Sequence, residues 1–504
     1  MKRITAVIML LSLCLTAFAM SSCSGNADTG TTAIDTTPAE NSGTEEEKLV
    51  LPEGMNYDGA DFFVLTAGNV AYNDFNYDED SAGVNAVSEA QYRRLLFMKD
   101  EYGVNVKSER KQNGSSYGGG PGYKTISSSV QSESTDFHLG IIGGYDVAAL
   151  ARENYLYDLN SLKWVETSKS WWDQNANNDL TIGDLLLFTN GSLTAAYSES
   201  TFAFYFNKDL AKIKLTDEQD PYQLVKDGKW TIDKLGELSR AASEDIDGNN
   251  TLNHLDRYGI YTWDDSMIGM VEAAGTKICT VGEDGKVSLT LQNSNTVNAI
   301  NAYASFAYDN SAALAYQAEM RAGRMTAAEV YAAFGEGRAL FWASSTNNLA
   351  TIRSMDGDFG ILPYPKLSEE QERYYSTIAP YNSQFICVPL YLEDGEYVGS
   401  VVEALAYHGK ELVTPAVYEK TLKGVYSRDE ESYEMLDIIY GSYGYDFGLY
   451  YRVGMYPDGL LNLLRNKSSA FTSMYEGSVI AAEQELLILN ENFNMLMDYW
   501  ADAE

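Results

Sequence analysis

The chain has 504 residues, which is more than a single hydrophobic core usually serves. Hydrophobic residues make up 45% of the chain, which is enough for sizeable cores. It contains 36 Lys and Arg residues against 72 Asp and Glu residues, so its formal net charge is −36. This acidic balance argues against binding of nucleic acid or of an anionic membrane surface by the protein body, whereas neutral or cationic small ligands stay open.

The N-terminus has the pattern of an export signal. Met1-Lys2-Arg3 is cationic, and the apolar run from Ile4 to Ala19 is too short for a comfortable membrane span. The stretch Met20-Ser21-Ser22-Cys23 resembles the lipobox of bacterial lipoproteins. The resemblance implies a signal peptide over residues 1–22, cleavage before Cys23 and a diacyl anchor on its thiol, which holds the protein at the extracytoplasmic face of a cell membrane. The alternative is a secretory signal with an incidental cysteine.

A polar tether follows over residues 23–54. From Ser24 to Lys48 it is rich in Ser, Gly, Thr and Asn, carries Glu at positions 45 to 47 and shows no periodic apolar pattern, so we expect it to be disordered. A flexible coil of this length would hold the folded body about 25–30 Å from the membrane.

Alternating strand and helix patterns begin after the tether. Short apolar runs predict strands, and runs with helical periodicity predict helices, the second of which we expect Asp146 to cap. The predicted strands are 61–66, 104–108 and 137–142, and the predicted helices are 86–101 and 146–154. The repeated strand-then-helix order predicts an α/β fold with a parallel sheet and ligands at the carboxyl ends of its strands.

A glycine-rich loop over residues 113–122 contains a formal match to the nucleophile elbow of hydrolases, with Ser116 at the serine position. That motif needs a buried strand before the serine and a helix directly after it. Here the preceding residues 107–112 are highly polar, and Gly119-Gly120-Pro121 follows. The sequence therefore favours a flexible loop.

An Asp- and Asn-rich stretch predicts a metal site. Oxygen ligands fall at loop positions one, three, five, nine and twelve, with a backbone carbonyl at position seven, a spacing that resembles the dockerin-type calcium loop. These residues are Asp245, Asp247, Asn249, Asn253 and Asp256, with the carbonyl of Thr251. Gly248 stands at position four instead of six, which leaves Asn250 to take the strained turn. We expect one structural Ca²⁺; the alternative is a solvated turn.

Catalytic signatures are missing from the sequence. It has no Walker A motif, no His-Glu-x-x-His and no dinucleotide fingerprint. A glycosidase carboxylate pair stays open, because such pairs are recognised by their separation in space. Cys279 and Cys387 remain once the signal and the anchor are set aside, and buried free thiols are favoured over one long-range disulfide.

Aromatic residues are abundant, with 7 Trp and 37 Tyr. Their flat apolar faces and polar groups suit stacking on sugar rings together with hydrogen bonding to sugar hydroxyls. Most of them are nevertheless expected to serve packing.

Several segments resemble, in the same order, extracellular solute-binding proteins of the maltose-binding class, the lipoprotein receptors of ATP-driven sugar importers. The likeness covers residues 58 to about 500, and the calcium-like loop followed by Arg257-Tyr-Gly-Ile260 looks like a subset of these receptors. The segments are 201–210, 228–235, 334–341 and 358–366.

The resemblance implies a two-lobed, periplasmic-binding-protein-like α/β fold with a hinge between the lobes. We expect residues 55–203 and 384–425 in the first lobe and residues 204–383 and 426–504 in the second. Phe202 to Asn207 and Gln384 to Pro389 are the expected crossing strands. The family implies no catalysis, a carbohydrate ligand, expected to be an oligosaccharide, a monomer and the permease subunits of an ABC transporter as partner. A surface-anchored glycoside hydrolase and a glycan adhesin are the alternatives.

Ligand contacts follow from the same resemblance. It implies contacts from the first lobe and from the matching edge of the second lobe, where the family often has a stacking Trp and this chain has small polar residues. We therefore expect Trp172 and Trp263 to supply the stacking faces, and Trp230 to be a packing residue. The other expected contacts are Gly144, Tyr145, Asp146, Glu199, Ser344 and Asn347.

Overall fold

The computed structural model describes residues 47–69, 74–112, 117–194, 200–418 and 429–502. Residues Lys48–Glu504 form one compact unit, and residues before Lys48 are a separate unit. The predicted signal peptide and Cys23 lie outside the described residues. Within the described ranges, no helix combines the length and the hydropathy that a membrane span needs.

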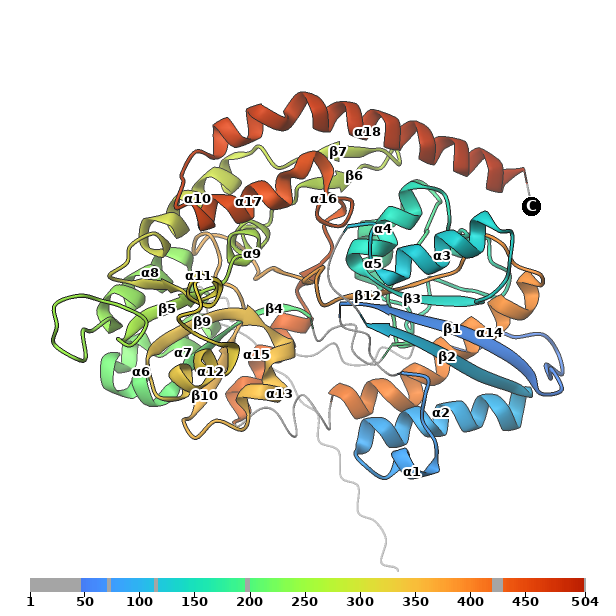
Figure 1. Cartoon of the computed structure of the whole chain (residues 1–504), viewed down its shortest axis with the longest axis horizontal. Helices are drawn as coiled ribbons and strands as arrows, with labels where there is room; N and C mark the ends of the chain where they lie inside the picture. The colour runs from blue at the N-terminus through green and yellow to red at the C-terminus, as the bar shows by residue number, and fades with distance from the viewer. Residues whose placement is uncertain (1–46, 70–73, 113–116, 195–199, 419–428, 503–504) are drawn as a thin grey trace, which may run out of the picture. The chain divides into compact units, whose positions relative to one another are not determined.

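Two main sheets organise the compact unit (Figure 1). The four-stranded sheet has the order β12-β3-β1-β2, and the five-stranded sheet has the order β10-β4-β9-β5-β8. We call the first sheet with its helices the first lobe, and the second sheet with its helices the second lobe. This is the predicted two-lobed α/β fold; the exact lobe boundaries stay a prediction.

The first sheet is parallel except at one edge. β1 pairs with β2 and β3 in parallel, and β12 pairs with β3 in antiparallel. Its strands are β1 (Ala60–Gly68), β2 (Val104–Gln112), β3 (Leu139–Gly143) and β12 (Gln384–Cys387). The predicted second strand, 104–108, continues to Gln112, because β2 is an edge strand whose polar end still pairs with β1.

Helices of the first lobe connect these strands as expected. Asn85 caps α2 by accepting hydrogen bonds from the backbone N–H groups of Val87 and Ser88, and Gly103 ends the helix with φ +60°. The helices are α1 (Glu79–Ala82), α2 (Ala86–Tyr102), α3 (Pro121–Gln131), α4 (Gly144–Arg152), η1 (Leu159–Ser161), α5 (Gln174–Leu180), α14 (Gly395–His408) and the π-helix η4 (Gly409–Val413).

In the second sheet β4 runs against its neighbours. β9 and β10 are both antiparallel to β4, and β5 is parallel to β9 and β8. The carboxyl ends of β5, β8, β9 and β10 therefore share one edge. The strands are β4 (Phe202–Asn207), β5 (Tyr258–Thr262), β8 (Ala313–Ala315), β9 (Ala339–Ser345) and β10 (Phe359–Leu362).

Helices of the second lobe fill the connections. Thr231 caps α8, and Trp230 beside it is fully buried and donates its indole N–H to the carbonyl of Pro363, so its predicted packing role is confirmed. The helices are α6 (Lys208–Lys214), η2 (Asp217–Gln219), α7 (Pro221–Lys226), α8 (Ile232–Ala242), α9 (Ser266–Ala273), α10 (Ser294–Ala307), α11 (Tyr316–Arg321), α12 (Ala327–Gly335), η3 (Thr346–Asn348), α13 (Leu349–Ile352) and α15 (Glu430–Tyr440).

The two predicted crossing strands lie inside the sheets. β4 pairs along its length with β9 of the second sheet, and β12 pairs with β3 of the first. Thr189 still pairs with Ile386 of the first lobe, so the chain passes between lobes after Thr189 and before Phe202. The apolar runs that suggested crossings are apolar because both strands are buried in sheets.

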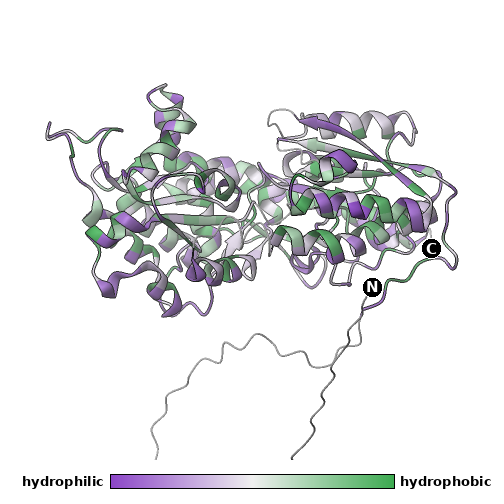
Figure 2. Cartoon of the chain, turned by 90° about the horizontal axis from the view of Figure 1, so that it is seen from below, coloured by the Kyte–Doolittle hydropathy of each residue, from purple (hydrophilic) through white to green (hydrophobic). Residues whose placement is uncertain are grey.

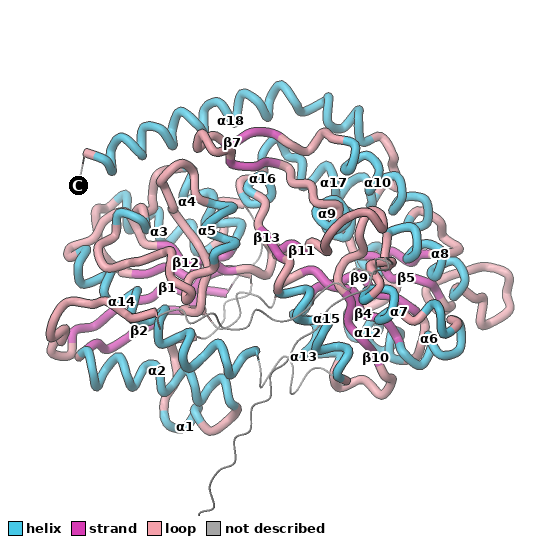
Figure 3. The backbone as a smooth tube through the Cα atoms, turned by 180° about the vertical axis from the view of Figure 1, so that it is seen from behind, coloured by secondary structure: helices cyan, strands magenta, loops and turns pink. Residues whose placement is uncertain are grey.

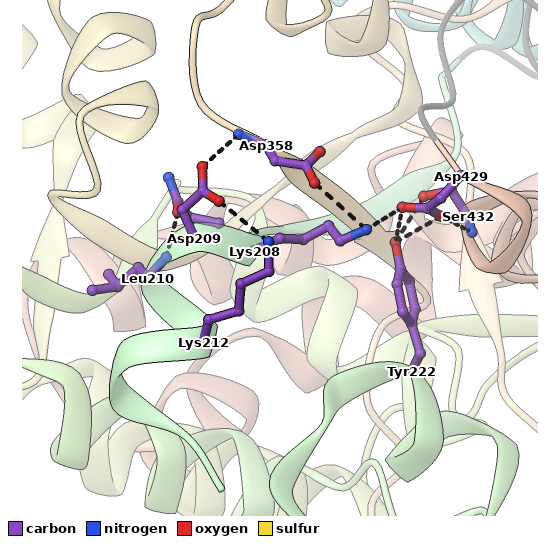
Figure 4. A network of polar contacts seen from close by, with 9 residues as sticks. Lys208, Asp209, Leu210, Lys212, Tyr222, Asp358, Asp429 and Ser432 are labelled. Atoms are coloured by element: carbon purple, nitrogen blue, oxygen red, sulfur yellow. Dashed lines mark hydrogen bonds and ion pairs between the residues drawn. The ribbon is translucent and has the colours of Figure 1, made fainter. Parts of the chain in front are cut away.

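Polar contacts fix α15 to the second lobe (Figure 4). Asp429 caps the helix by accepting a hydrogen bond from the backbone N–H of Ser432. Its carboxylate lies 2.5 Å from Nζ of Lys208, the first residue of α6, and accepts a hydrogen bond of 3.2 Å from the Tyr222 hydroxyl. These contacts join the start of α15 to the end of β4.

The C-terminal elements contact both lobes, and Figure 3 shows α18 above the hairpin of β6 and β7. Arg152 of α4 and Glu485 of α18 form an ion pair of 2.6 Å, and Asn490 of α18 exchanges two hydrogen bonds with Val287 of β7. The C-terminal elements are β13 (Tyr443–Gly444), α16 (Phe447–Tyr450), η6 (Val453–Met455), α17 (Tyr456–Arg465) and α18 (Phe471–Ala501), and the remaining strands, from the middle of the chain, are β6 (Cys279–Val281), β7 (Val287–Leu289) and β11 (Ser376–Thr377).

Apolar residues concentrate in the strands, and polar residues cover the outer turns (Figure 2). The strands β3, β4, β5, β9 and β10 are buried at every position. Cys279 and Cys387 are free and buried, so the favoured interpretation of both thiols is confirmed.

Candidate functional site

Aromatic and acidic residues collect at the carboxyl edge of the second sheet. Trp263 and Asp265 follow β5, Tyr316 follows β8, and Tyr364 follows β10 by two residues. Because these strands run in one direction, their carboxyl ends bring the side chains to the same edge, which is where open α/β sheets bind ligands. We call Tyr145, Trp263, Asp265, Tyr316 and Tyr364 the Asp265 cluster; Tyr145 comes from the first lobe.

Two adjacent carboxylates in this edge have different surroundings. Asp264 is buried and pairs with two guanidinium groups, with 2.6 Å to Nη1 of Arg321 and 2.7 Å to Nε of Arg465. Asp265 is half-buried, and among the described residues no other residue donates a hydrogen bond to its carboxylate or forms an ion pair with it. Asp264 is therefore structural, whereas Asp265 is free to accept hydrogen bonds from a ligand.

The environment of Asp265 disfavours its charge. Burial raises the pKa of its carboxyl to about 6, the charge of Asp264 raises it in addition, and Arg465 offsets only part of this. A carboxyl with a strongly shifted pKa at a sheet edge is typical of a functional site.

Tyrosines from both lobes interact electrostatically with Asp265. Its charge reaches Tyr145, Tyr316 and Tyr364 and contributes to the raised pKa of each phenol, after the larger contribution of burial. All three phenols therefore stay protonated and can donate hydrogen bonds. The Tyr364 hydroxyl accepts a hydrogen bond of 3.0 Å from the indole N–H of Trp263, which fixes that ring.

On the first-lobe side, further rings extend the cluster. Tyr145 lies 4.1 Å from Tyr117 and 6.3 Å from Tyr381 between ring centroids, and Tyr381 is 47% exposed. The guanidinium of Arg452 lies 4.5 Å above the Tyr117 ring and forms two hydrogen bonds, of 2.7 and 2.8 Å, with Asp458. This arrangement offers aromatic faces beside a neutralised cation.

The turn that carries Arg452 has an unusual backbone. Arg452, Gly454 and Met455 all have φ between +55° and +58°. Glu485 of α18 accepts a hydrogen bond from the backbone N–H of Gly454, and Arg152 of α4 donates one to the carbonyl of Tyr451. Such strain persists only where surrounding contacts hold it, and it clusters at functional sites.

Of the predicted first-lobe contacts, Tyr145 is in the cluster and Asp146 is a correction. Asp146 is buried, and its two carboxylate oxygens accept hydrogen bonds from the backbone N–H groups of Gly120 and Tyr123 at the start of α3. It therefore caps α3 and does not cap α4, which begins two residues earlier at Gly144. Gly144 lies so close to the carbonyl of Pro380 that a Cβ would stand 2.9 Å from it.

Trp172 is a second correction, because it lies in the first-lobe core. Its side chain is almost fully buried and donates its indole N–H to Glu403 at 3.0 Å, next to the matching bond of 2.9 Å from Trp171. A ring enclosed in this way has no face for a ligand. Glu199 and Ser116 lie outside the described residues.

Ser344 and Asn347 lie at the second-lobe edge, as predicted. Ser344 is buried at the end of β9, opposite Ala203, and accepts a hydrogen bond of 2.6 Å from the Asn348 amide. The Asn347 side chain accepts one of 2.5 Å from Ser345. Both residues are already engaged within the edge, so we place them beside the cluster as supporting residues.

The predicted calcium loop brings its carboxylates together. Oxygens of Asp245, Asp247 and Asp256 lie within 4.8 Å of one another, and Asn250 has φ +62°, as the spacing predicted. Such a set of oxygens fits a hard cation. The amide oxygens of Asn249 and Asn253 instead accept hydrogen bonds from backbone N–H groups of the loop itself, and the Thr251 carbonyl accepts one from Asn253. Oxygens of Asp245, Asp247 and Asp256 also accept backbone N–H groups of the loop, so binding of Ca²⁺ stays a prediction.

Sequence reasoning missed Asp265, Tyr316 and Tyr364. The signal was present, since an aromatic residue and two acids follow the apolar run 258–262. It was used only for Trp263. Which of two adjacent aspartates is free depends on Arg321 and Arg465, which are distant in sequence, so a linear pattern does not decide it.

No protein-family model and no curated protein sequence matches the chain. Among solved structures, the chain is similar to UspC of Mycobacterium tuberculosis, with a TM-score of 0.52, 14% identity and coverage of 84% of this chain and 99% of that one. It is also similar to the GacH receptor of Streptomyces glaucescens, solved unliganded and with acarbose (TM-score 0.50, 13% identity, 86% and 98% coverage). A third is an ABC transporter solute-binding protein from Thermotoga lettingae, bound with α-D-tagatose (TM-score 0.51, 14% identity, 85% and 100% coverage). The chain therefore has the two-lobed fold of solute-binding proteins.

Proposed function

We propose that the protein is an extracytoplasmic receptor that binds a carbohydrate between its lobes and delivers it to an ABC transporter. The observation that carries the proposal is the Asp265 cluster, in which a carboxyl without an ion-pair partner among the described residues lies with aromatic residues at the second-lobe sheet edge and interacts with Tyr145 of the first lobe. Sugars present apolar C–H faces and hydroxyl groups, so a sugar site needs aromatic planes and hydrogen-bonding groups. The cluster supplies both.

Each part of the cluster has a proposed role. Tyr145, which is half-buried, presents an aromatic face and donates a hydrogen bond to a sugar oxygen, and Asp265 accepts hydrogen bonds from sugar hydroxyls. The buried side chains of Trp263, Tyr316 and Tyr364 support this edge from beneath. A ligand that contacts both lobes binds the closed form more tightly than the open form. Because a ligand shifts the equilibrium toward the form that it binds more tightly, ligand binding favours closure. A receptor binds its ligand without converting it. We expect the ligand to be an oligosaccharide.

Anchoring and metal binding complete the proposal. The lipobox-like segment supports a diacyl anchor on Cys23 and a location at the outer face of the cell membrane. The permease subunits of the transporter are the proposed protein partner of a monomeric receptor. The carboxylates of Asp245, Asp247 and Asp256 support one structural Ca²⁺ in the second lobe.

A thermal-shift screen against mono- and oligosaccharides tests the receptor function. A ligand at one hundred times its dissociation constant raises the free energy of unfolding by about 2.7 kcal/mol. We expect one class of glycan to raise the melting temperature without forming product. Product formation would instead support an anchored glycoside hydrolase. If no glycan of a broad panel changes the melting temperature, a carbohydrate receptor is contradicted.

A further inference from the structure

The unpaired charge of Asp265 is the part of the site that a neutral sugar explains least well. Its neighbour Asp264 has two guanidinium partners, whereas Asp265 has no ion-pair partner among the described residues. Building on the receptor function proposed above, we propose that the ligand carries a protonated amine that binds Asp265. The ligand class is then an amino sugar, or an oligosaccharide that contains one.

Enclosing the lone charge of Asp265 under a ligand is costly. A ligand that covers Asp265 removes water from its carboxylate, and an ionised group without a partner is expensive in a dry site. Hydroxyl groups of a neutral sugar compensate part of that cost through hydrogen bonds. An ammonium group compensates the charge itself and forms a stronger, charge-assisted hydrogen bond.

Asp265 is the N-cap residue of α9, whose positive end offsets part of its charge, but no ion pair within the described residues neutralises it. The charged and titratable groups that act on Asp265 or respond to it are Asp264, Arg465, Tyr145, Tyr316 and Tyr364. Arg465 is bound to Asp264 at 2.7 Å, and Arg321 is bound to the same carboxylate. The tyrosines stay neutral. An ammonium group on the ligand therefore supplies the full counter-charge that these side chains lack.

The surroundings of Asp265 also attract cations. Aromatic rings bind cations through their negative faces, and Arg452 already lies over Tyr117, which leaves the rings of Tyr145 and the exposed Tyr381 for the ligand. The formal net charge of −36 draws cationic ligands toward the protein and repels anionic ones. Phenol hydroxyls remain available for the sugar oxygens of the same ligand.

Calorimetry with a matched pair of ligands tests this inference. Chitotriose with free amines and its N-acetylated counterpart share one sugar backbone and differ in charge. At mildly acidic to neutral pH and low salt, we expect the free-amine form to bind at least about tenfold more tightly. Its affinity should fall as salt is added, whereas that of the N-acetylated form should not change. Ethanolamine, an amine without a sugar, should bind far more weakly than either trimer.

Asp265→Asn keeps the shape of the side chain and removes its charge. The variant should lose most of the preference for the free amine over the N-acetylated trimer, because its uncharged amide can accept hydrogen bonds from either ligand but cannot pair with an ammonium group. Asp284→Asn removes one charge from the exposed turn between β6 and β7 and should change neither affinity. For the unaltered protein, affinity for the amine should fall below about pH 6 as Asp265 becomes protonated, and fall again at high pH as the ligand amine loses its proton.

The outcomes separate this inference from the receptor function. Equal binding of both trimers, insensitive to salt and to Asp265→Asn, would overturn the inference and leave the receptor standing. Tight binding of ethanolamine would overturn the sugar part of the ligand class. If no glycan of either kind binds, the proposed function itself fails. If Asp265→Asn does not fold, the salt and pH dependence of amine binding by the unaltered protein still tests whether the ligand amine pairs with a carboxylate.

Discussion

Glu403 is a buried acid whose carboxyl accepts hydrogen bonds from two tryptophans. Its carboxyl accepts the indole N–H groups of Trp171 and Trp172, which lower its pKa, but burial has the larger effect and raises the pKa to about 7. A group with a raised folded-state pKa contributes stability that is present below its unfolded pKa and is lost as pH rises through the folded value.

We predict that this acid makes the first lobe less stable as pH rises from about 4.5 to above 7. The expected contribution is on the order of 3 kcal/mol across that window, because each unit of pKa shift corresponds to about 1.4 kcal/mol. Glu403→Gln cannot ionise, so the stability difference between the unaltered protein and the variant should shrink with rising pH. Urea unfolding at several pH values measures it. Parallel stability curves would contradict the prediction.

At the scale of elements, the loop from Asp245 to Asp256 is the clearest case of a sequence motif with a structural consequence. We predict that chelation lowers the melting temperature and that Ca²⁺ restores it. At one hundred times its dissociation constant, Ca²⁺ should raise the free energy of unfolding by about 2.7 kcal/mol. Asp247→Asn should reduce the calcium effect, because Asp247 is the exposed member of the three carboxylates that we propose as ligands. If calorimetry detects no calcium binding at millimolar concentration, the prediction of a calcium site is wrong and the loop is a solvated turn.

The strained turn before α17 depends on α18. Glu485 forms the ion pair with Arg152 and accepts the hydrogen bond from Gly454, so Glu485→Ala should cost about 1–3 kcal/mol and release the turn. Glu485→Gln, which can still accept from Gly454, is the matched control. Hydrogen exchange at residues 452–455 should speed up in the alanine variant only. Unchanged exchange there would mean that other contacts hold the turn.

Local patterns predicted the elements better than the contacts between them. The apolar run at 137–142 and the helical periodicity at 86–101 were sufficient to predict β3 and α2, because burial alone produces these patterns. Asp146 and Trp172 were misplaced for one reason. Their partners, the N-terminus of α3 and Glu403 on α14, are distant in sequence, and a side chain's role depends on the partner it meets. The free carboxylate of Asp265 was missed for the same reason.

For the whole molecule, the anchor decides where the receptor works. We predict that Cys23→Ala moves the protein from the membrane fraction to the soluble fraction or leaves it unprocessed, because the variant lacks the thiol that carries the diacyl group. Cys279→Ser, which alters a buried thiol of the body, is the control for effects of cysteine replacement. Normal processing together with unchanged fractionation of Cys23→Ala would contradict a lipid anchor.

Closure on a ligand is the central claim, because the Asp265 cluster draws its residues from both lobes. The most direct test is the radius of gyration from small-angle scattering, measured with and without a saturating glycan found in the thermal-shift screen. A hinge that closes on ligand brings the lobes together, so the account predicts a smaller radius with ligand and no change for Tyr145→Ala at the same ligand concentration. An unchanged radius in the presence of a demonstrably bound glycan would contradict closure between the lobes.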